Sequence, residues 1–257
     1  MAMPVQQVFK RVEKKYLVDS EQYNGLMPVL TEHMKADEYG LHTICNVYYD
    51  NLNNDLIRVS IEKPVYKEKF RVRSYGIPSD DDTVFLEIKK KAQGVVYKRR
   101  IPFKMRDARE VLKKISESDK MSGIIVGIDV NDSNYPVFDD VSNRQIMHEI
   151  EYIIKHYNLV PDTYVAYDRI ALFGLEEPDL RITFDKNIRT RKDRLSLSEG
   201  DSGEVILEDG KYIMEVKTNG SMPLWLAKKI SEMELYPFSF SKIGTAYKKK
   251  ITGGIGQ

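Results

Sequence analysis

The sequence lacks what several common kinds of functional site require. Its 257 residues include one cysteine, Cys45, so no internal disulfide can form and a reducing compartment fits the chain. The four histidines are scattered without the spacing of metal ligands, which argues against a zinc site. No apolar run approaches the length that crosses a bilayer, and no signal-peptide core is present. We therefore expect a cytoplasmic protein without direct membrane insertion.

The chain also has almost no net charge. Lysine and arginine number 40, aspartate and glutamate number 39, and the formal net charge is +1. A non-specific nucleic-acid binder is usually strongly basic, so nucleic acid is not the expected partner. No G-x-x-x-x-G-K-[ST] motif occurs, which excludes a nucleotide site of the P-loop kind. What matters is therefore where the cations lie within individual segments.

Strands dominate what the sequence does contain. Alternating apolar and polar residues predict strands over 9–18, 42–50, 66–76, 83–91, 95–103, 163–174 and 180–191. Periodicity and capping residues predict helices over 20–35, 53–63, 105–118, 139–158 and 223–233. We also expect a hairpin over 203–217, turned at Asp209-Gly210, and a strand that divides the lysines of 248–250 between two faces. No linker or repeat interrupts the chain, so we expect one domain over 1–257.

The strand "KFRVRSYG" (69–76) shows an unusual division of its side chains. Phe70 and Val72 fall on one face, whereas Lys69, Arg71 and Arg73 fall on the other. Polar residues share one face in the same way in five other strands: Arg11, Glu13 and Lys15; Glu87, Lys89 and Lys91; Lys98 and Arg100; Arg181, Thr183 and Asp185; Glu215 and Lys217. For any one strand, a sheet with one solvated face is the ordinary explanation.

That explanation weakens when the strands are taken as a set. Solvated sheet faces usually mix Thr, Ser, Gln, Glu and Lys, whereas these faces are rich in Arg and Lys. Like charges on neighbouring strands destabilise a sheet unless an anion lies between them. Closing the strands into a barrel would enclose the charges and leave the apolar faces for helices to cover. A lumen with many cations and a few carboxylates suits a polyphosphate chain with a divalent metal.

Eight short motifs extend this pattern over nearly the whole chain. In order they are "EKKYLV", "FRVRSYG", "VFLEIKKK", "YKRR", "AYDRIALFG", "LRITFD", "MEVK" and "FSKIG". In this order and spacing the chain resembles the triphosphate tunnel metalloenzymes, and within them the catalytic domain of the vacuolar transporter chaperone (VTC) polyphosphate polymerases. The resemblance implies an α+β fold: a closed antiparallel eight-stranded β-barrel with helices packed on its outside. Such a tunnel binds a nucleoside triphosphate through its phosphates.

The resemblance also implies roles for individual residues. The substrate-binding residues would be Lys15, Arg71, Arg73, Lys89, Lys98, Arg169, Arg181 and Lys242. Those with a catalytic role as well would be Arg71, Arg73, Lys89, Arg181 and Lys242. Glu215 would hold the metal, Mn2+ or Mg2+. Two positions depart from the family pattern: Arg11 replaces the first glutamate of the E-x-E-x-K signature of tunnel hydrolases, and Ser239 stands where family members tend to carry a lysine.

The function implied is that of a polyphosphate polymerase, which transfers the terminal phosphoryl group of ATP to a growing chain. Its substrates would be ATP and inorganic phosphate, pyrophosphate or polyphosphate. Arg11 agrees better with this branch than with a tunnel triphosphatase or nucleoside triphosphatase, which is the first alternative. The second alternative is a non-catalytic polyphosphate-binding module, against which Glu13 and Glu215 argue. The sequence has no membrane segment for translocating a product, and a membrane-bound subunit is a candidate partner.

Overall fold

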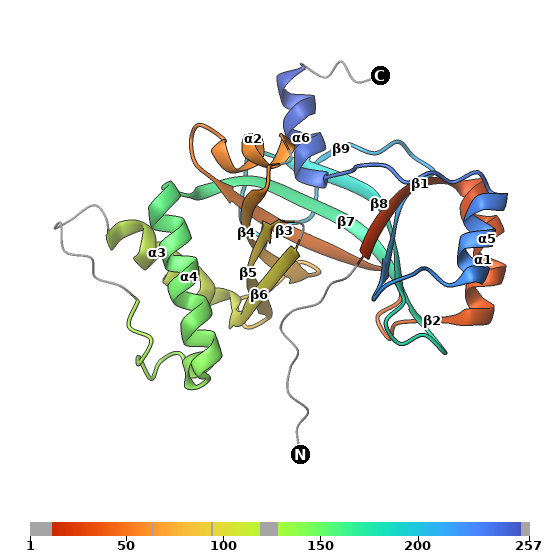
Figure 1. Cartoon of the computed structure of the whole chain (residues 1–257). Helices are drawn as coiled ribbons and strands as arrows, with labels where there is room; N and C mark the ends of the chain where they lie inside the picture. Colours follow the sequence, from red (N-terminus) through yellow and green to blue (C-terminus); the bar gives the residue numbers. More distant parts are fainter. Residues whose placement is uncertain (1–11, 63, 94, 119–127, 253–257) are drawn as a thin grey trace. The chain divides into compact units, whose positions relative to one another are not determined.

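The computed structural model describes residues 12–62, 64–93, 95–118 and 128–252, and it shows an α+β fold with a large antiparallel sheet (Figure 1). The chain divides into two compact units. The first unit consists of Met1–Ile44, Ala166–Thr190 and Gly203–Gln257, and the second consists of Cys45–Val165 and Arg191–Ser202. Two strands, β3 (His42–Asp50) and β7 (Val160–Gly174), contribute residues to both units.

The first unit contains one end of the sheet. Its strands follow the order β1 (Val12–Asp19), β10 (Lys211–Thr218), β8 (Arg181–Arg191), β7 and β3. Two short strands lie off this path: β2 (Met34–Ala36) pairs with β7, and β9 (Glu204–Val205) pairs with β8. Its helices are α1 (Ser20–His33), α5 (Leu224–Glu232) and α6 (Lys242–Ile251). Asp19 begins α1 as a capping box with Gln22, which is the N-cap chemistry that the sequence predicts.

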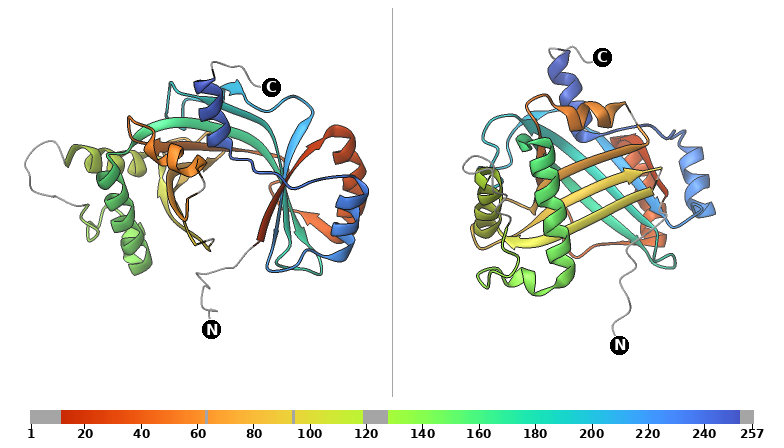
Figure 2. Two further views of the ribbon diagram at one scale, coloured as in Figure 1. Left: turned by 45° about the horizontal axis from the view of Figure 1, so that its top comes forward. Right: turned by 60° about the vertical axis from the view of Figure 1, so that its left-hand side comes forward.

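The apolar face of this part of the sheet forms the core of the first unit. Tyr16, Ile182, Phe184 and Met214 are buried there, and α1 and α5 lie side by side against them (Figures 1 and 2). The helices contribute buried leucines and an isoleucine to the same cluster: Leu26, Leu30, Leu226 and Ile230. Helices therefore cover the apolar face, as the sequence predicts, and the polar side chains of β1, β10 and β8 point the other way.

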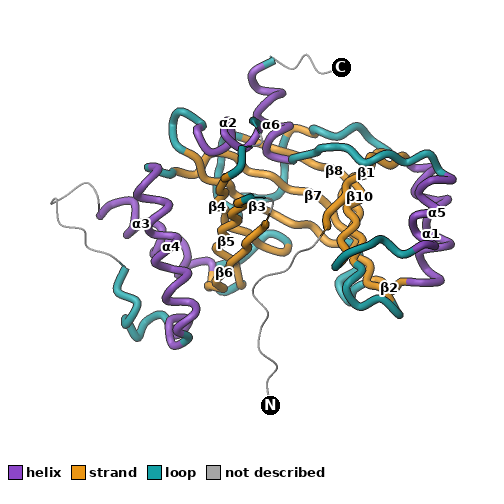
Figure 3. The backbone as a smooth tube through the Cα atoms, in the orientation of Figure 1, coloured by secondary structure: helices purple, strands orange, loops and turns teal. Residues whose placement is uncertain are grey.

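The second unit contains the other end of the sheet. Its strand order runs from β7 and β3 to β4 (Tyr66–Tyr75), β5 (Thr83–Ala92) and β6 (Val95–Lys104). Its helices are α2 (Asp55–Ile61), α3 (Met105–Ser118) and α4 (Val141–Tyr157), with a 3-10 turn, η1 (Pro136–Asp139). Figure 3 shows α3 and α4 beside strands β4 to β6, and the right-hand view of Figure 2 shows α4 crossing one face of these strands.

Apolar side chains hold α3 and α4 against β4, β5 and β6. Phe70, Leu86 and Ile101 are buried on the sheet, and Ile115 and Ile150 are buried on the helices. These strand residues alternate with the lysines and arginines of the opposite face, so the helices leave the charged face uncovered within this unit. Cys45 is buried.

Two expectations from the sequence are wrong. Residues 203–217 form no hairpin, although the turn at Asp209-Gly210 is present, with Lys211 N–H donating to Glu208 C=O over 3.2 Å. Both edges of β10 are taken by β1 and β8, and β9 pairs instead with Arg189 and Thr190, beyond the part of β8 that β10 covers.

The lysine run at 248–250 lies in the helix α6 and not in a strand. Ser241 begins this helix by accepting a hydrogen bond from Gly244 N–H, and the lysines occupy its last turn, where cations stabilise the unpaired carbonyls. Among the helices of the described residues, none combines the length and the apolar character needed to cross a membrane. Arg11 lies outside the described residues.

Candidate active site

The pairing register of β4, β5 and β6 gathers cations into cross-strand rows. On the face opposite α3 and α4, one row consists of Lys69, Lys89 and Lys98, and the next consists of Arg71, Glu87 and Arg100. The following row begins with Arg73. We call the charged members of these rows the β4–β6 cluster: Lys69, Arg71, Arg73, Glu87, Lys89, Lys98 and Arg100. It contains a single carboxylate among six cations.

Glu87 is the centre of this cluster. Its side chain is 1% exposed, and Arg71 contacts one carboxylate oxygen, Oε2, through both Nε (2.8 Å) and Nη2 (2.6 Å). Arg73 Nε lies 3.7 Å from the same oxygen, and Lys98 Nζ lies 3.0 Å from the other, Oε1. Burial favours the neutral acid, but the charges of Arg71, Arg73 and Lys98 outweigh it and hold the pKa of Glu87 well below its usual range.

Two residues of β3 that the sequence did not mark as site residues help to hold the arginines. Arg71 Nη1 donates to the Tyr48 hydroxyl over 2.7 Å, and Arg73 Nε donates to the Asn46 side-chain oxygen over 2.9 Å. Both guanidiniums are therefore fixed by neutral and charged acceptors together. The alternation of "HTICNVYYD" places Asn46 and Tyr48 on one face, but only the strand pairing shows that this face carries the arginines.

The cations of the cluster also help to lower the pKa values of two further residues. Burial raises the pKa of Tyr48, but Arg71, Lys69 and Arg73 outweigh it and lower the value to about 8. Desolvation lowers the pKa of Lys98 to about 8, and the nearby arginines add to this while Glu87 opposes it. Although 42% of the Lys98 side chain is exposed, its ammonium is crowded by the guanidiniums that share Glu87. Three cations on one carboxylate leave charge that an anion would neutralise.

A second group of charged residues lies in the first unit. The register of β1, β10 and β8 places Glu13, Lys217 and Arg181 in one row, and Lys15, Glu215 and Thr183 in the next. We call the charged residues on this face, with their contacts from β7 and α6, the β1–β8 cluster: Glu13, Lys15, Arg169, Arg181, Asp185, Glu215, Lys217 and Lys242. Here carboxylates and cations are closer to balance.

Asp185 anchors two of the expected phosphate-binding residues. Its side chain is fully buried and accepts both Arg169 Nε (2.6 Å) and Arg169 Nη2 (2.8 Å), while Lys242 also donates to it. The ring of Tyr167 lies under both cations, 5.1 Å from the Arg169 guanidinium carbon and 4.3 Å from Lys242 Nζ. Burial raises the pKa of Asp185, but Lys242 and Arg169 outweigh it and lower the pKa. Lys242 reaches this position because Ser241 begins α6 directly before it.

Glu215, the expected metal ligand, lies beside this anchor. Its side-chain oxygens are 3.4 Å from Lys217 Nζ, 3.8 Å from Lys15 Nζ and 3.8 Å from Arg169 Nη2. Burial raises the pKa of Glu215, but its side-chain contact with Glu13 and the charges of the neighbouring lysines hold it well below its usual range. Glu215 is therefore a carboxylate in this environment, which is the form that binds a metal.

The donor set fits a metal that is shared with substrate. Within the described part of the chain, no group of three or more His, Cys, Asp or Glu side chains gathers into a metal site. Mg2+ or Mn2+ in phosphoryl-transfer sites commonly uses one or two carboxylates together with substrate phosphates and water. Glu215 and its neighbour Glu13 supply carboxylates of this kind, and the surrounding lysines would attract the phosphates that complete the coordination.

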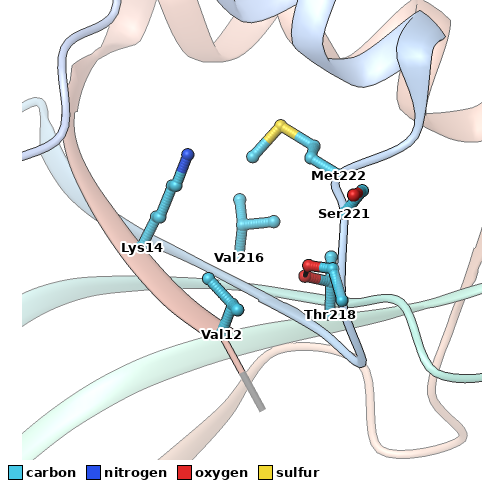
Figure 4. A pocket seen from close by; sticks show the side chains of 7 residues that line it. Val12, Lys14, Val216, Thr218, Ser221 and Met222 are labelled. Atoms are coloured by element: carbon cyan, nitrogen blue, oxygen red, sulfur yellow. Dashed lines mark hydrogen bonds between the residues drawn. The ribbon is translucent and has the colours of Figure 1, made fainter. Parts of the chain in front are cut away.

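A pocket of ≈ 240 Å³ in the first unit does not involve these residues. It is lined by Val12, Lys14, Val216, Thr218, Gly220, Ser221 and Met222. Figure 4 shows the side chains of the six of these residues that it labels. Val12 and Lys14 alternate with Glu13 and Lys15 along β1, so the pocket opens on the face away from Glu215. We assign it no part in phosphate binding.

The structure brings the expected site residues together within each unit. Arg71, Arg73, Lys89 and Lys98 belong to the β4–β6 cluster, and Lys15, Arg169, Arg181, Lys242 and Glu215 belong to the β1–β8 cluster. Ser239 is exposed in the segment between α5 and α6. The sequence placed Glu87 and Asp185 on the polar faces but gave them no role, because their function depends on which cations the pairing brings beside them.

Comparison with known proteins identifies the family of the chain and solved structures to which it is similar. A family model described as the VTC domain matches residues 10–250. A solved structure from Hippeastrum, described as an adenylyl cyclase with a dominant triphosphatase activity, is 16% identical and covers 95% of this chain and 97% of its own, with a TM-score of 0.51. The chain is also similar to an adenylate cyclase-type structure from Vibrio parahaemolyticus, with 9% identity over 94% of this chain and 99% of that one and a TM-score of 0.46. It is similar as well to the Pyrococcus horikoshii protein PH1819, with 13% identity over 93% of this chain and 99% of that one and a TM-score of 0.44. No curated protein matches the chain.

We expect Glu87→Gln to destabilise the protein by about 3–5 kcal/mol, because it leaves buried guanidiniums without their counter-ion. Urea unfolding measures this loss. Inorganic tripolyphosphate should then restore more stability to the variant than it adds to the wild type, since the ligand replaces the missing negative charge. Glu110→Gln, on the exposed surface of α3, is the matched control and should change little. Equal stabilisation of variant and wild type by tripolyphosphate would show that these cations do not bind phosphate.

We expect the affinity for tripolyphosphate to fall as the pH rises through about 8. Above that pH the ammonium of Lys98 loses its positive charge and the hydroxyl of Tyr48 gains a negative one, so both changes weaken anion binding. Tyr48→Phe removes one of the two titrations and should make the fall shallower. Calorimetric titration of both proteins with the same ligand cancels the ligand's own ionisation. Identical pH profiles would contradict the role given to Tyr48.

Proposed function

Because the chain belongs to the VTC domain family, we propose that it is a metal-dependent polyphosphate polymerase, which transfers the terminal phosphoryl group of ATP to a growing polyphosphate chain. The observation that carries this proposal is the β4–β6 cluster, in which six cations lie on one face with a single buried carboxylate, and three of them contact it. A face with that excess of cations over carboxylates is suited to a ligand whose charges repeat at short intervals along a chain.

The proposal includes a closed eight-stranded barrel formed by one domain over 1–257. Eight strands lie on the path from β1 to β6, and in each unit helices pack on the apolar face of the strands. These features support closure with both charged faces turned inward, as in a tunnel. In that arrangement both clusters would act on the same chain of phosphates.

The chemistry of the clusters favours a phosphate acceptor over water. Water needs a general base to become a good nucleophile, and no histidine occurs among the described residues that form either cluster. The carboxylates of Glu87, Asp185 and Glu215 have lowered pKa values and are weak bases. The terminal oxygen of a polyphosphate is already anionic at neutral pH and needs no base.

In the proposed reaction, that oxygen forms a bond to the γ-phosphorus of ATP while the bond to the β,γ-bridging oxygen breaks and ADP leaves. The arginines of both clusters would hold the transferring group in line and neutralise the charge that develops on its oxygens. A bound divalent metal would supply further neutralisation of the β- and γ-phosphates, with Glu215 as its protein ligand. A tunnel-type triphosphatase remains the alternative, in which water takes the place of the acceptor.

The reaction products decide between these functions. We expect the protein, incubated with ATP and Mn2+, to yield a ladder of polyphosphates on a denaturing gel, with ADP as the second product. Release of orthophosphate without a ladder would identify a triphosphatase. Tight binding of polyphosphate with no consumption of ATP would identify a binding module.

We expect Glu215→Gln to abolish metal-dependent turnover while the protein stays folded and still binds tripolyphosphate. The substitution keeps the shape of the side chain but removes the charge that a divalent cation requires. Initial rates over a range of Mn2+ concentrations measure the loss, and thermal unfolding checks the fold. Glu204→Gln, at an exposed glutamate of β9, is the control and should remain active. Full activity of the Glu215 variant would remove this residue from the site.

A further inference from the structure

The charged face of β4, β5 and β6 ends in aromatic side chains. Tyr75 follows Arg73 by two residues on β4, and Phe85 precedes Glu87 by two residues on β5, so both rings share the face of the cations. The register places Phe85 directly between Arg73 and Pro102. None of the roles assigned so far uses these rings.

The rings are arranged as a partly open platform. Tyr75 meets Phe85 edge-on, with ring centroids 5.8 Å apart and an interplanar angle of 84°. The guanidinium carbon of Arg100 lies 4.7 Å from the centroid of the Phe85 ring. Tyr75 is 51% exposed, Phe85 is half-buried and Arg100 is exposed. Water therefore still reaches much of this surface, although a large aromatic ring gains stability by being covered.

Exposed aromatic rings and a planar guanidinium form the kind of surface on which a nucleobase stacks. The position of the platform matches the layout of a nucleotide. Successive rows on one face of a strand are two residues apart, so the row of Lys69, Lys89 and Lys98 lies about 13 Å from the row of Phe85. The row of Arg71 and Glu87 lies between them. An extended nucleoside triphosphate carries its base at one end and its phosphates at the other, in the same order.

We propose that Tyr75, Phe85 and Arg100 form a nucleobase-stacking subsite, which orients ATP with its base at the Tyr75 end and its terminal phosphate at the lysine row. This inference rests on the proposed function, because it takes ATP as the phosphoryl donor. It adds a direction to that function: the acceptor chain approaches from the side of Lys69, Lys89 and Lys98. Inorganic tripolyphosphate has no base and gains nothing from the subsite.

The test compares ATP with inorganic tripolyphosphate as ligands of the full chain. Dissociation constants are measured by calorimetry at a fixed Mn2+ concentration, without any need for turnover. We expect Tyr75→Ala to weaken ATP binding at least about fivefold, the lower end of the effect of losing a base-stacking contact. The same variant should bind tripolyphosphate within about twofold of the wild type, which lies inside the effect of an ordinary surface substitution.

Three further variants separate stacking from structural effects. Tyr75→Phe keeps the ring and should bind ATP like the wild type, whereas Phe85→Leu keeps apolar bulk without the ring and should weaken ATP selectively. Tyr97→Ala removes a tyrosine of similar exposure (40%) from the other face of β6 and should change neither constant. Thermal unfolding of each variant identifies any loss of fold.

The outcomes distinguish this inference from the proposed function. If Tyr75→Ala and Phe85→Leu leave ATP binding unchanged, or weaken ATP and tripolyphosphate equally, the subsite is wrong while phosphate binding stands. Wild-type protein that binds tripolyphosphate but not ATP also overturns the subsite. Wild-type protein that binds neither ligand overturns both the subsite and the proposed function.

Discussion

The charged face of the second unit depends on one buried carboxylate. The pairing register of β4, β5 and β6 places Lys69, Lys89 and Lys98 side by side, and Arg71 and Arg73 follow two residues apart on the same face of β4. Such an arrangement destabilises a sheet when nothing negative lies among the cations. Glu87 removes part of this cost by contacting Arg71, Arg73 and Lys98 at once. One carboxylate cannot neutralise all of them. The fold is thus compatible with the cluster, while the remaining charge is available to an anionic ligand.

In the β1–β8 cluster, the repulsion among neighbouring cations is offset by more carboxylates. Asp185 binds Arg169 and Lys242, and Glu215 lies among Lys15 and Lys217, so most cations have a carboxylate nearby. Such a cluster attracts a bare phosphate less strongly, but it contains three carboxylates, whereas the β4–β6 cluster contains only Glu87, which its own cations surround. The β4–β6 cluster therefore suits phosphate oxygens, and the β1–β8 cluster suits phosphate together with a cation.

The alternation of single strands was enough to predict which face of each strand is charged, and the apolar faces were correctly assigned to helices. The sequence was less informative about which strands pair with one another. The predicted hairpin over 203–217 does not form because β10 already pairs with β1 and β8. Residues 248–250 are helical because Ser241 caps the helix α6 that contains them. Tyr48 and Asp185 were assigned no role from the sequence for a related reason. Their roles come from cations on other strands or on α6, and a single segment carries no information about its neighbours.

The cations also differ in how firmly carboxylates hold their side chains in place. Arg71 and Arg169 are held by short contacts to Glu87 and Asp185, so their orientation is set before any ligand arrives, which lowers the cost of reorganisation during charge transfer. Lys89 is exposed and carries its charge on a flexible stem. The polymerase reaction that we propose would use both kinds: fixed donors where the phosphoryl group is transferred, and mobile point charges where the product chain advances by one phosphate per cycle. Fixed donors along the whole path would bind the chain but resist its movement.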